Sequence, residues 1–207
     1  MIVKICGIKT LKELEIVEKY ADFGGVVVET ESKRRVSLDK AKEIIHSAKI
    51  PVFVVSTLKS EKEWQLLIEK TEASFVQIHS NAKPETVEAV RELGVKVMKA
   101  FRVPKKSRNP KKEAEKIGNE IELYNSDFIL LDTGRGSGEQ HDHRISRILA
   151  ERFDVILAGG LTPENVERVV NFVKPIGVDV SSGVEAYGEK NEILVKEFVK
   201  KARGGIC

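Results

Sequence analysis

The chain has 207 residues, with 35 basic and 32 acidic side chains, a formal net charge of +3 and a hydrophobic fraction of 41%. This composition is typical of a globular protein with a sizeable core, and no apolar run reaches the roughly 18 residues that cross a bilayer. The basic stretches lack interleaved aromatic residues, so we expect neither a membrane nor a nucleic acid as a partner.

Two cysteines, Cys6 and Cys207, stand far apart in the sequence and indicate neither a disulfide framework nor a metal site. The sequence opens on a strand-like run without the features of a secretory signal peptide. We therefore expect a cytoplasmic protein. His79, His141 and His143 do not have the spacing of metal ligands, so no metal centre is expected either.

Short runs rich in Val, Ile or Phe alternate with longer amphipathic runs, several of which follow a Ser or Thr cap. In chain order, with strand and helix alternating, the predicted elements are Ile2–Cys6, Leu11–Tyr20, Phe23–Val28, Leu38–Ser47, Val52–Val55, Glu61–Thr71, Ser74–Ile78, Pro84–Leu93, Val95–Ala100, Pro110–Leu123, Asp127–Leu131, His143–Arg152, Val155–Ala158, Pro163–Val173, Ile176–Val180 and Asn191–Ala202.

Eight strands in alternation with eight helices predict a (β/α)8 TIM barrel, with residues 1–207 forming a single domain. A doubly wound open sheet shows the same alternation and is the alternative. The barrel is favoured because eight repeats are many for an open sheet, and no Gly-x-Gly-x-x-Gly motif follows the first strand. Functional residues of such a barrel are expected in the loops that follow the strands.

The first predicted strand ends at Cys6-Gly7. Val3 and Ile5 suit the face that packs on helices, which turns Lys4 and Cys6 into the barrel. Lys4 lies one layer deeper and is interpreted as a paired interior cation. Cys6 is either a packed thiol or, with positive charge or backbone N–H groups nearby, a proton carrier.

Polar residues end three other predicted strands. Asp132 follows four apolar residues, where it either caps a loop or presents a carboxyl group over the barrel mouth. The ends of strands one and six face each other obliquely across a closed ring, so Cys6 and Asp132 are a candidate base and acid. Arg34 is a candidate ligand of an anion or an exposed charge. His79 is a candidate catalyst or a hydrogen-bonding residue of the rim.

The loops after the seventh and eighth predicted strands are rich in Gly and Ser. They read Ala158-Gly159-Gly160-Leu161-Thr162-Pro163 and Asp179-Val180-Ser181-Ser182-Gly183-Val184-Glu185. In barrels these two loops and the N-terminus of a short extra helix often bind phosphate, and residues 182–185 are the candidate for that helix. Ordinary turn chemistry is the alternative interpretation.

Taken in order, these motifs resemble the phosphoribosylanthranilate isomerases of tryptophan biosynthesis, and the resemblance covers nearly the whole chain. It rests on six segments: Lys4-Ile5-Cys6-Gly7-Ile8, Ser32-Lys33-Arg34, Val76-Gln77-Ile78-His79, Leu130-Leu131-Asp132-Thr133, Ala158–Val166 and Asp179–Glu185.

The resemblance implies an Amadori rearrangement of N-(5-phosphoribosyl)anthranilate to a 1-(carboxyphenylamino)-1-deoxyribulose 5-phosphate, with no metal or organic cofactor. It implies Cys6 as the general base, Asp132 as the general acid and Arg34 as the ligand of the anthranilate carboxylate. The further substrate-binding residues that it implies are Gln77, His79, Gly159, Gly160, Asp179, Ser181, Ser182 and Gly183. The expected partner is this small substrate, and the expected assembly is a monomer or a homodimer.

Three segments depart from the family pattern. Thr30 and Glu31 replace a region with a proline, Gly134–Gly138 replaces the usual glycine-rich lid, and His141-Asp142-His143 replaces Phe-Asp-Trp. The departures put the packing of the lid and the substrate range in question, but they leave the acid, base and phosphate positions intact.

Two other classes of function fit part of the pattern. A ribulose-phosphate epimerase or thiamine-phosphate synthase would share the phosphate loops, but metal-site histidines and a pyrophosphate-binding pattern are missing from the sequence. A non-catalytic sensor of phosphoribosyl ligands would bind without turnover and would tolerate the loss of Cys6.

Overall fold

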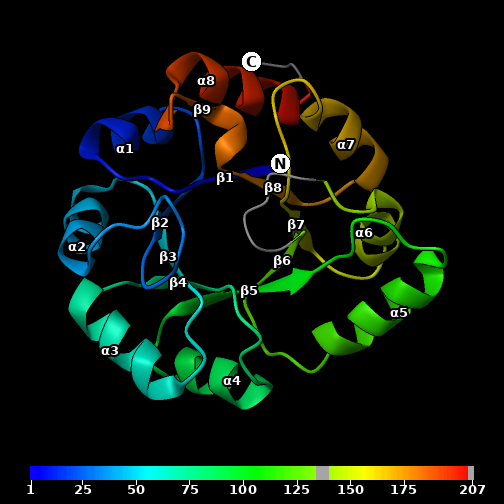
Figure 1. Cartoon of the computed structure of the whole chain (residues 1–207), viewed down its shortest axis with the longest axis horizontal. Coiled ribbons are helices and arrows are strands. Elements are labelled where there is room, and N and C mark those ends of the chain that lie inside the picture. Colours follow the sequence, from blue (N-terminus) through cyan, green and yellow to red (C-terminus); the bar gives the residue numbers. More distant parts are fainter. Residues whose placement is uncertain (134–139, 205–207) are drawn as a thin grey trace.

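A computed structural model describes residues 1–133 and 140–204, and these form a closed barrel of parallel strands enclosed by helices, which confirms the predicted fold (Figure 1). The elements are β1 (Ile2–Cys6), α1 (Leu11–Glu18), β2 (Phe23–Val27), α2 (Leu38–Ser47), β3 (Val52–Ser56), α3 (Glu61–Thr71), β4 (Phe75–Ile78), α4 (Pro84–Glu92), β5 (Lys96–Arg102), α5 (Pro110–Ile121), β6 (Phe128–Asp132), α6 (His143–Ala150), β7 (Val155–Leu157), α7 (Val166–Val173), β8 (Gly177–Val180), the 3-10 helix η1 (Ser182–Val184), β9 (Glu185–Ala186), β10 (Glu189–Lys190) and α8 (Glu192–Ala202).

Most predicted elements differ by one or two residues at one or both ends, and two differences have a visible structural reason. α7 begins at Val166 and not at Pro163, because the Asn165 side chain accepts from Thr162 N–H and donates to the Gly160 carbonyl, which holds the preceding residues in a turn. β5 continues past Ala100 to Arg102, because its pairing with β6 extends to Asp132.

The hairpin of β9 and β10 was not predicted from the sequence. It turns at Tyr187 and Gly188, whose φ angles are 53° and 81°. This left-handed pair is the geometry of a tight two-residue hairpin turn, and a tyrosine there is an uncommon signal for it. The hairpin brings Lys190 back to the end of β8.

Alternation along the strands divides the core into two layers. Outward-facing residues such as Val3, Ile5 and Val54 pack beneath the helices, whereas inward-facing residues fill the barrel. The Phe53 ring lies at the centre of the interior, with ring centroids of Phe23, Phe75 and Phe128 within 5.3 to 5.6 Å in edge-on contacts. The lower barrel is therefore solid and apolar, and open space is confined to its mouth.

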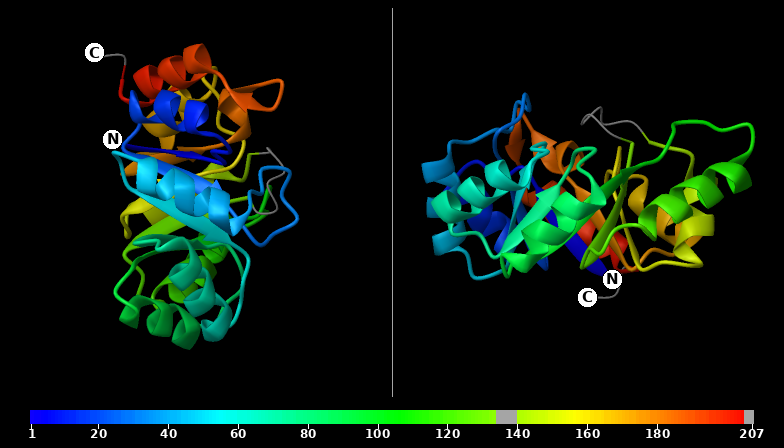
Figure 2. Two further views of the ribbon diagram at one scale, coloured as in Figure 1. Left: turned by 90° about the vertical axis from the view of Figure 1, so that its left-hand side faces the viewer. Right: turned by 90° about the horizontal axis from the view of Figure 1, so that it is seen from below.

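The catalytic face expected of such a barrel lies opposite the N-terminus. In Figure 2 the connection from β2 to α2, coloured blue, projects on the side away from the N-terminus in both views. Within residues 1–133 and 140–204, no helix has the length and apolar character to cross a membrane.

We expect Phe53→Ala to lower the free energy of unfolding by about 3–5 kcal/mol, because the cavity left inside the barrel cannot collapse easily. Urea denaturation followed by fluorescence measures the change. Phe172→Ala is the matched control, since that ring is 40% exposed. Equal losses in both variants would contradict the interior role of Phe53.

Candidate active site

The carboxyl ends of the strands surround a cavity of about 1120 Å³. Ten of the sequence-predicted site residues line it: Cys6, Arg34, Gln77, His79, Asp132, Gly159, Gly160, Asp179, Ser181 and Ser182. Gly183 is not among the residues that line it, and its Cα faces the Leu161 carbonyl in the loop that follows β7. The sequence motifs thus meet in one place although they come from six different strand ends.

Cys6 lies at the floor of this cavity and is 8% exposed. The neighbouring Lys4 is fully buried, and its Nζ lies 3.0 Å from Asp179 Oδ1, which confirms the predicted paired interior cation. Burial raises the pKa of the Cys6 thiol, whereas the positive charges of Lys4 and Lys190 oppose that rise. The structure therefore surrounds a buried sulfur with cationic groups.

Asp132 lies across the mouth from Cys6 in a hydrogen-bonded chain. Its Oδ2 is 3.1 Å from His79 Nε2, and the His79 Nδ1 is 3.2 Å from Gln77 Nε2. The Gln77 amide and the Asp132 carboxyl group thus hold the His79 ring at both of its nitrogens. The chain fixes the position of the Asp132 carboxyl group and connects it to a half-buried imidazole.

Arg34 joins the loop after β2 to the hairpin after β8. Its Nε and Nη2 donate to the two oxygens of Glu185 at 2.7 and 2.8 Å, and Lys190 donates to Glu185 Oε1 at 2.7 Å. Burial alone would raise the pKa of the Glu185 carboxyl group, but these bonds hold that pKa below its usual value. The bidentate geometry fixes the plane of the guanidinium and leaves Nη1 unused by Glu185.

Gly7 allows Arg34 to reach Glu185. Its φ is +83°, and a Cβ there would lie 2.5 Å from Arg34 Cδ and 2.9 Å from Ser181 Oγ. A side chain at position 7 would push Arg34 off the end of β1 as well as strain the backbone. The Cys-Gly pair therefore serves two adjacent parts of the site.

The loops after β7 and β8 touch each other. A Cβ on Gly183 would lie 1.9 Å from the Leu161 carbonyl oxygen, so these backbones are in contact. Within the described ranges, no protein acceptor is found for the N–H groups of Gly160, Ser182 and Gly183. Unsatisfied N–H groups on adjacent loops form a ready site for an anion. The η1 helix confirms the predicted short helix at this point.

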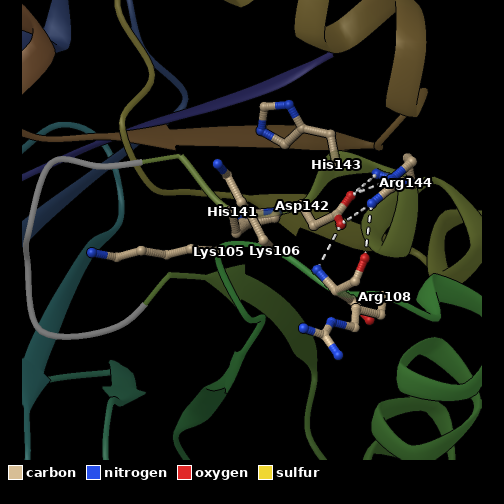
Figure 3. Close-up of a pocket in the computed structure, with 8 residues that line it drawn as sticks. Lys105, Lys106, Arg108, His141, Asp142, His143 and Arg144 are labelled. Atoms are coloured by element: carbon tan, nitrogen blue, oxygen red, sulfur yellow. Dashed lines mark hydrogen bonds and ion pairs between the residues drawn. The ribbon is translucent and has the colours of Figure 1, made fainter.

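A second cavity of about 670 Å³ lies between the β5–α5 connection and the start of α6. The Asp142 carboxylate lies at its centre and accepts from Arg144 at 2.6 Å and from Ser107 N–H at 3.1 Å (Figure 3). In this view the His143 ring and Arg108 lie on opposite sides of Asp142. The Arg144 guanidinium thus already has a carboxylate partner in Asp142, and we assign no ligand to this cavity.

Two histidines stand where the family resemblance led us to expect aromatic residues. The His141 and His143 rings meet edge-on at 5.0 Å, and His141 Nε2 lies 2.6 Å from Ser146 Oγ. They thus pack as aromatic rings would. The expected lid Gly134–Gly138 lies outside the described residues.

Two functional residues, Glu185 and Lys190, were not predicted from the sequence. Glu185 belongs to a quoted motif, but nothing in the motif indicates that it holds Arg34. Lys190 carries no local signal at all, because only the hairpin brings it to the site. Among residues 1–133 and 140–204, no three His, Cys, Asp or Glu side chains form a group that could hold a metal ion.

The comparisons with known proteins agree on one family. The model of the family described as N-(5'phosphoribosyl)anthranilate (PRA) isomerase matches residues 3–201. The chain is 58% identical over 204 residues to the N-(5'-phosphoribosyl)anthranilate isomerase of Pyrococcus abyssi, covering 98% of each chain.

Solved structures give the same result. The isomerase of Pyrococcus furiosus superimposes with a TM-score of 0.93 at 55% identity, over 98% of each chain. A phosphoribosyl anthranilate isomerase in complex with reduced 1-(o-carboxyphenylamino)-1-deoxyribulose 5-phosphate superimposes with a TM-score of 0.82 at 31% identity, over 99% of this chain and 100% of that one.

The buried His141 predicts a pH-dependent stability. Burial, aided by His143, lowers the pKa of its imidazole to about 4, whereas the unfolded chain binds this proton near pH 6.5. Between these values the unfolded state holds more protons, so the free energy of unfolding falls as the pH drops from 6.5 to 4. The expected loss is up to about 3 kcal/mol.

Urea denaturation across this pH range measures the effect. His141→Phe should remove most of the slope, whereas the control His46→Gln, at an exposed position, should retain it. An unchanged slope in His141→Phe would show that other groups cause the pH dependence.

Proposed function

The chain belongs to the N-(5'phosphoribosyl)anthranilate (PRA) isomerase family and isomerises N-(5'-phosphoribosyl)anthranilate to 1-(o-carboxyphenylamino)-1-deoxyribulose 5-phosphate, and from this premise we propose which residues do the chemistry. The reaction is an aldose-to-ketose isomerisation in tryptophan biosynthesis. Family membership favours it over the epimerase, synthase and sensor alternatives that the phosphate loops alone leave open.

We propose Asp132 as the general acid and Cys6 as the general base. The Asp132 carboxyl group gives a proton to the ring oxygen as the C1–O bond of the furanose breaks, which leaves an iminium at C1. The Cys6 thiolate then takes the proton from C2, and the electrons of the C–H bond form an enolamine. Tautomerisation of the enolamine gives the ketone. The observation that carries this assignment is that both groups border one cavity, from strand ends on opposite sides of its mouth.

The substrate has two anionic ends, and we propose a separate site for each. The free edge of the Arg34 guanidinium receives the anthranilate carboxylate, because Glu185 holds the opposite edge. The loops after β7 and β8 receive the phosphate through the N–H groups of Gly160, Ser182 and Gly183. Gln77, His79, Gly159, Asp179 and Ser181 complete the proposed substrate site. The Ser181 hydroxyl donates to the Cys6 carbonyl at 2.9 Å, so its side chain also joins β8 to β1.

Four further expectations belong to this proposal. The enzyme acts in the cytoplasm, works without a metal or organic cofactor, consists of one domain over residues 1–207, and is a monomer or a homodimer. Its partner is the small-molecule substrate, with neither nucleic acid nor membrane involved.

We expect Cys6→Ser and Asp132→Asn each to lower kcat by at least about a hundredfold, in line with the usual contribution of a positioned acid or base. The assay follows the loss of anthranilate-type fluorescence from freshly prepared substrate. Cys207→Ser is the matched control for the thiol and should leave turnover unchanged. Full activity in either site variant would remove that residue from its proposed role, and saturable binding without turnover in the wild type would support the sensor alternative.

We expect Gly183→Ala to weaken phosphate binding, because its Cβ would collide with the Leu161 carbonyl and move the loop after β8. The KM should rise roughly tenfold or more, as for the loss of hydrogen bonds to a charged group, and the inhibition constant of inorganic phosphate should rise with it. Gly118→Ala in α5 is the control, since the closest neighbour of its Cβ would be the flexible end of Arg152, with the Phe153 ring at an ordinary contact distance of 3.5 Å. An unchanged inhibition constant would place the phosphate elsewhere.

A further inference from the structure

The Lys4 ammonium is held at a fixed point beneath the mouth. Lys4 is fully buried and faces Asp179 directly in the pairing of β1 with β8, with Nζ 3.0 Å from Oδ1. The Phe53 ring centroid lies 5.8 Å from the same nitrogen. An ammonium has three N–H donors, and the Asp179 oxygen uses one of them. The pair therefore leaves donors for another neighbour.

Gly25 lets that neighbour be Cys6. It faces Cys6 in the pairing of β1 with β2, and a Cβ there would lie 3.1 Å from Cys6 Sγ and 3.3 Å from Lys4 Nζ. Both atoms thus border the one space that the missing side chain leaves open. The Lys4 ammonium and the Cys6 sulfur therefore lie close enough to interact electrostatically, and the Lys4 charge acts to lower the pKa of the thiol. A larger residue at position 25 would press on both the sulfur and the ammonium.

The charges around the sulfur oppose one another. Burial raises the pKa of the Cys6 thiol. The Lys4 ammonium is the strongest influence that lowers this pKa. The Asp179 carboxylate raises it further, and the Lys190 ammonium lowers it. Arg34 is the other cation that interacts with Cys6. Lys4 itself stays charged, because burial alone would lower its pKa but Asp179 and Cys6 together raise it.

We propose that Lys4 is a positioning residue for the base: its ammonium, anchored by Asp179, stabilises the thiolate of Cys6 at the floor of the mouth. The inference rests on the proposed function, in which Cys6 takes the C2 proton. A neutral thiol cannot accept a proton, so the fraction of enzyme with a Cys6 thiolate limits the rate at a given pH. Lys4 acts on that fraction without touching the substrate.

The test measures the thiolate directly, without turnover. In a Cys207→Ser background Cys6 is the single cysteine of the sequence, and its alkylation by iodoacetamide is followed by mass spectrometry from pH 5 to 10. We expect Lys4→Met to raise the midpoint of the alkylation profile by at least about one pH unit, and Asp179→Asn to lower it. The double variant Lys4→Met/Asp179→Asn should fall between the two.

Lys99→Met is the matched control for removal of a buried lysine. Lys99 is 2% exposed, but its Nζ lies among the Phe101 and Tyr124 rings in the outer layer of the core. Its removal should leave the alkylation midpoint unchanged. A shift as large as that of Lys4→Met would overturn the proposal, because the effect would then follow from loosened packing.

The opposite signs decide between an electrostatic role and a structural one. An ion pair that serves only stability would move the midpoint in the same direction in both single variants, or in neither, and either result overturns the proposal. If Lys4→Met does not fold, Asp179→Asn alone decides, since an unchanged or raised midpoint contradicts the proposed charge balance.

The pH profile of kcat/KM tests the link to catalysis. In the active variants its acid limb should shift with the alkylation midpoint, and an acid limb that stays in place overturns that link. Failure of the proposed function is a separate result: Cys6→Ser would then keep full turnover, whatever the alkylation profiles show.

Discussion

β1 and β8 come from opposite ends of the chain, and they are neighbours only because the sheet closes. This seam carries Lys4 opposite Asp179, and two residues further along the chain on each side the Ser181 hydroxyl donates to the Cys6 carbonyl. The backbone register of the closing pair therefore fixes the depth of Cys6 relative to the loop after β8. Because the proposed phosphate and proton-transfer sites share this seam, a slip in register would separate them.

The apolar lower barrel gives the charges above it their strength. Phe53 and its aromatic neighbours fill the interior, so Lys4, Cys6 and Asp179 lie between a dry core and an open cavity. Charges at such a boundary interact more strongly than in water, but each also loses hydration. An unpaired lysine there would be strongly destabilising, whereas the ion pair with Asp179 compensates for the lost hydration. The chemistry of the thiol and the stability of the barrel are thus coupled in one cluster.

The part of the mouth beside this seam is organised by charged side chains that bind one another. The Glu185 carboxylate accepts hydrogen bonds from Arg34 and Lys190, and Lys190 also donates to the Ser181 carbonyl at 3.1 Å. The network ties the loop after β2 to the hairpin after β8 and orients the guanidinium before any ligand arrives. Preorganisation of this kind lowers the entropic cost of binding. The network also gives the short hairpin after η1 a structural role, because its second strand, β10, carries the Lys190 side chain to Glu185.

The sequence by itself determined the order of strands and helices, the barrel, the inward direction of Lys4 and Cys6, and the strand ends that carry Arg34, His79 and Asp132. These features depend on residue periodicity and on motifs that are local in the chain, which one sequence displays directly. The start of α7, the extension of β5 and the β9–β10 hairpin depended on contacts with other segments. So did the partners of the site residues: Asp179 for Lys4, Glu185 for Arg34 and Gln77 with Asp132 for His79. Only the tertiary structure decided these, because hydrogen bonds and ion pairs between distant segments form at distances that closure of the barrel sets and that no local pattern encodes.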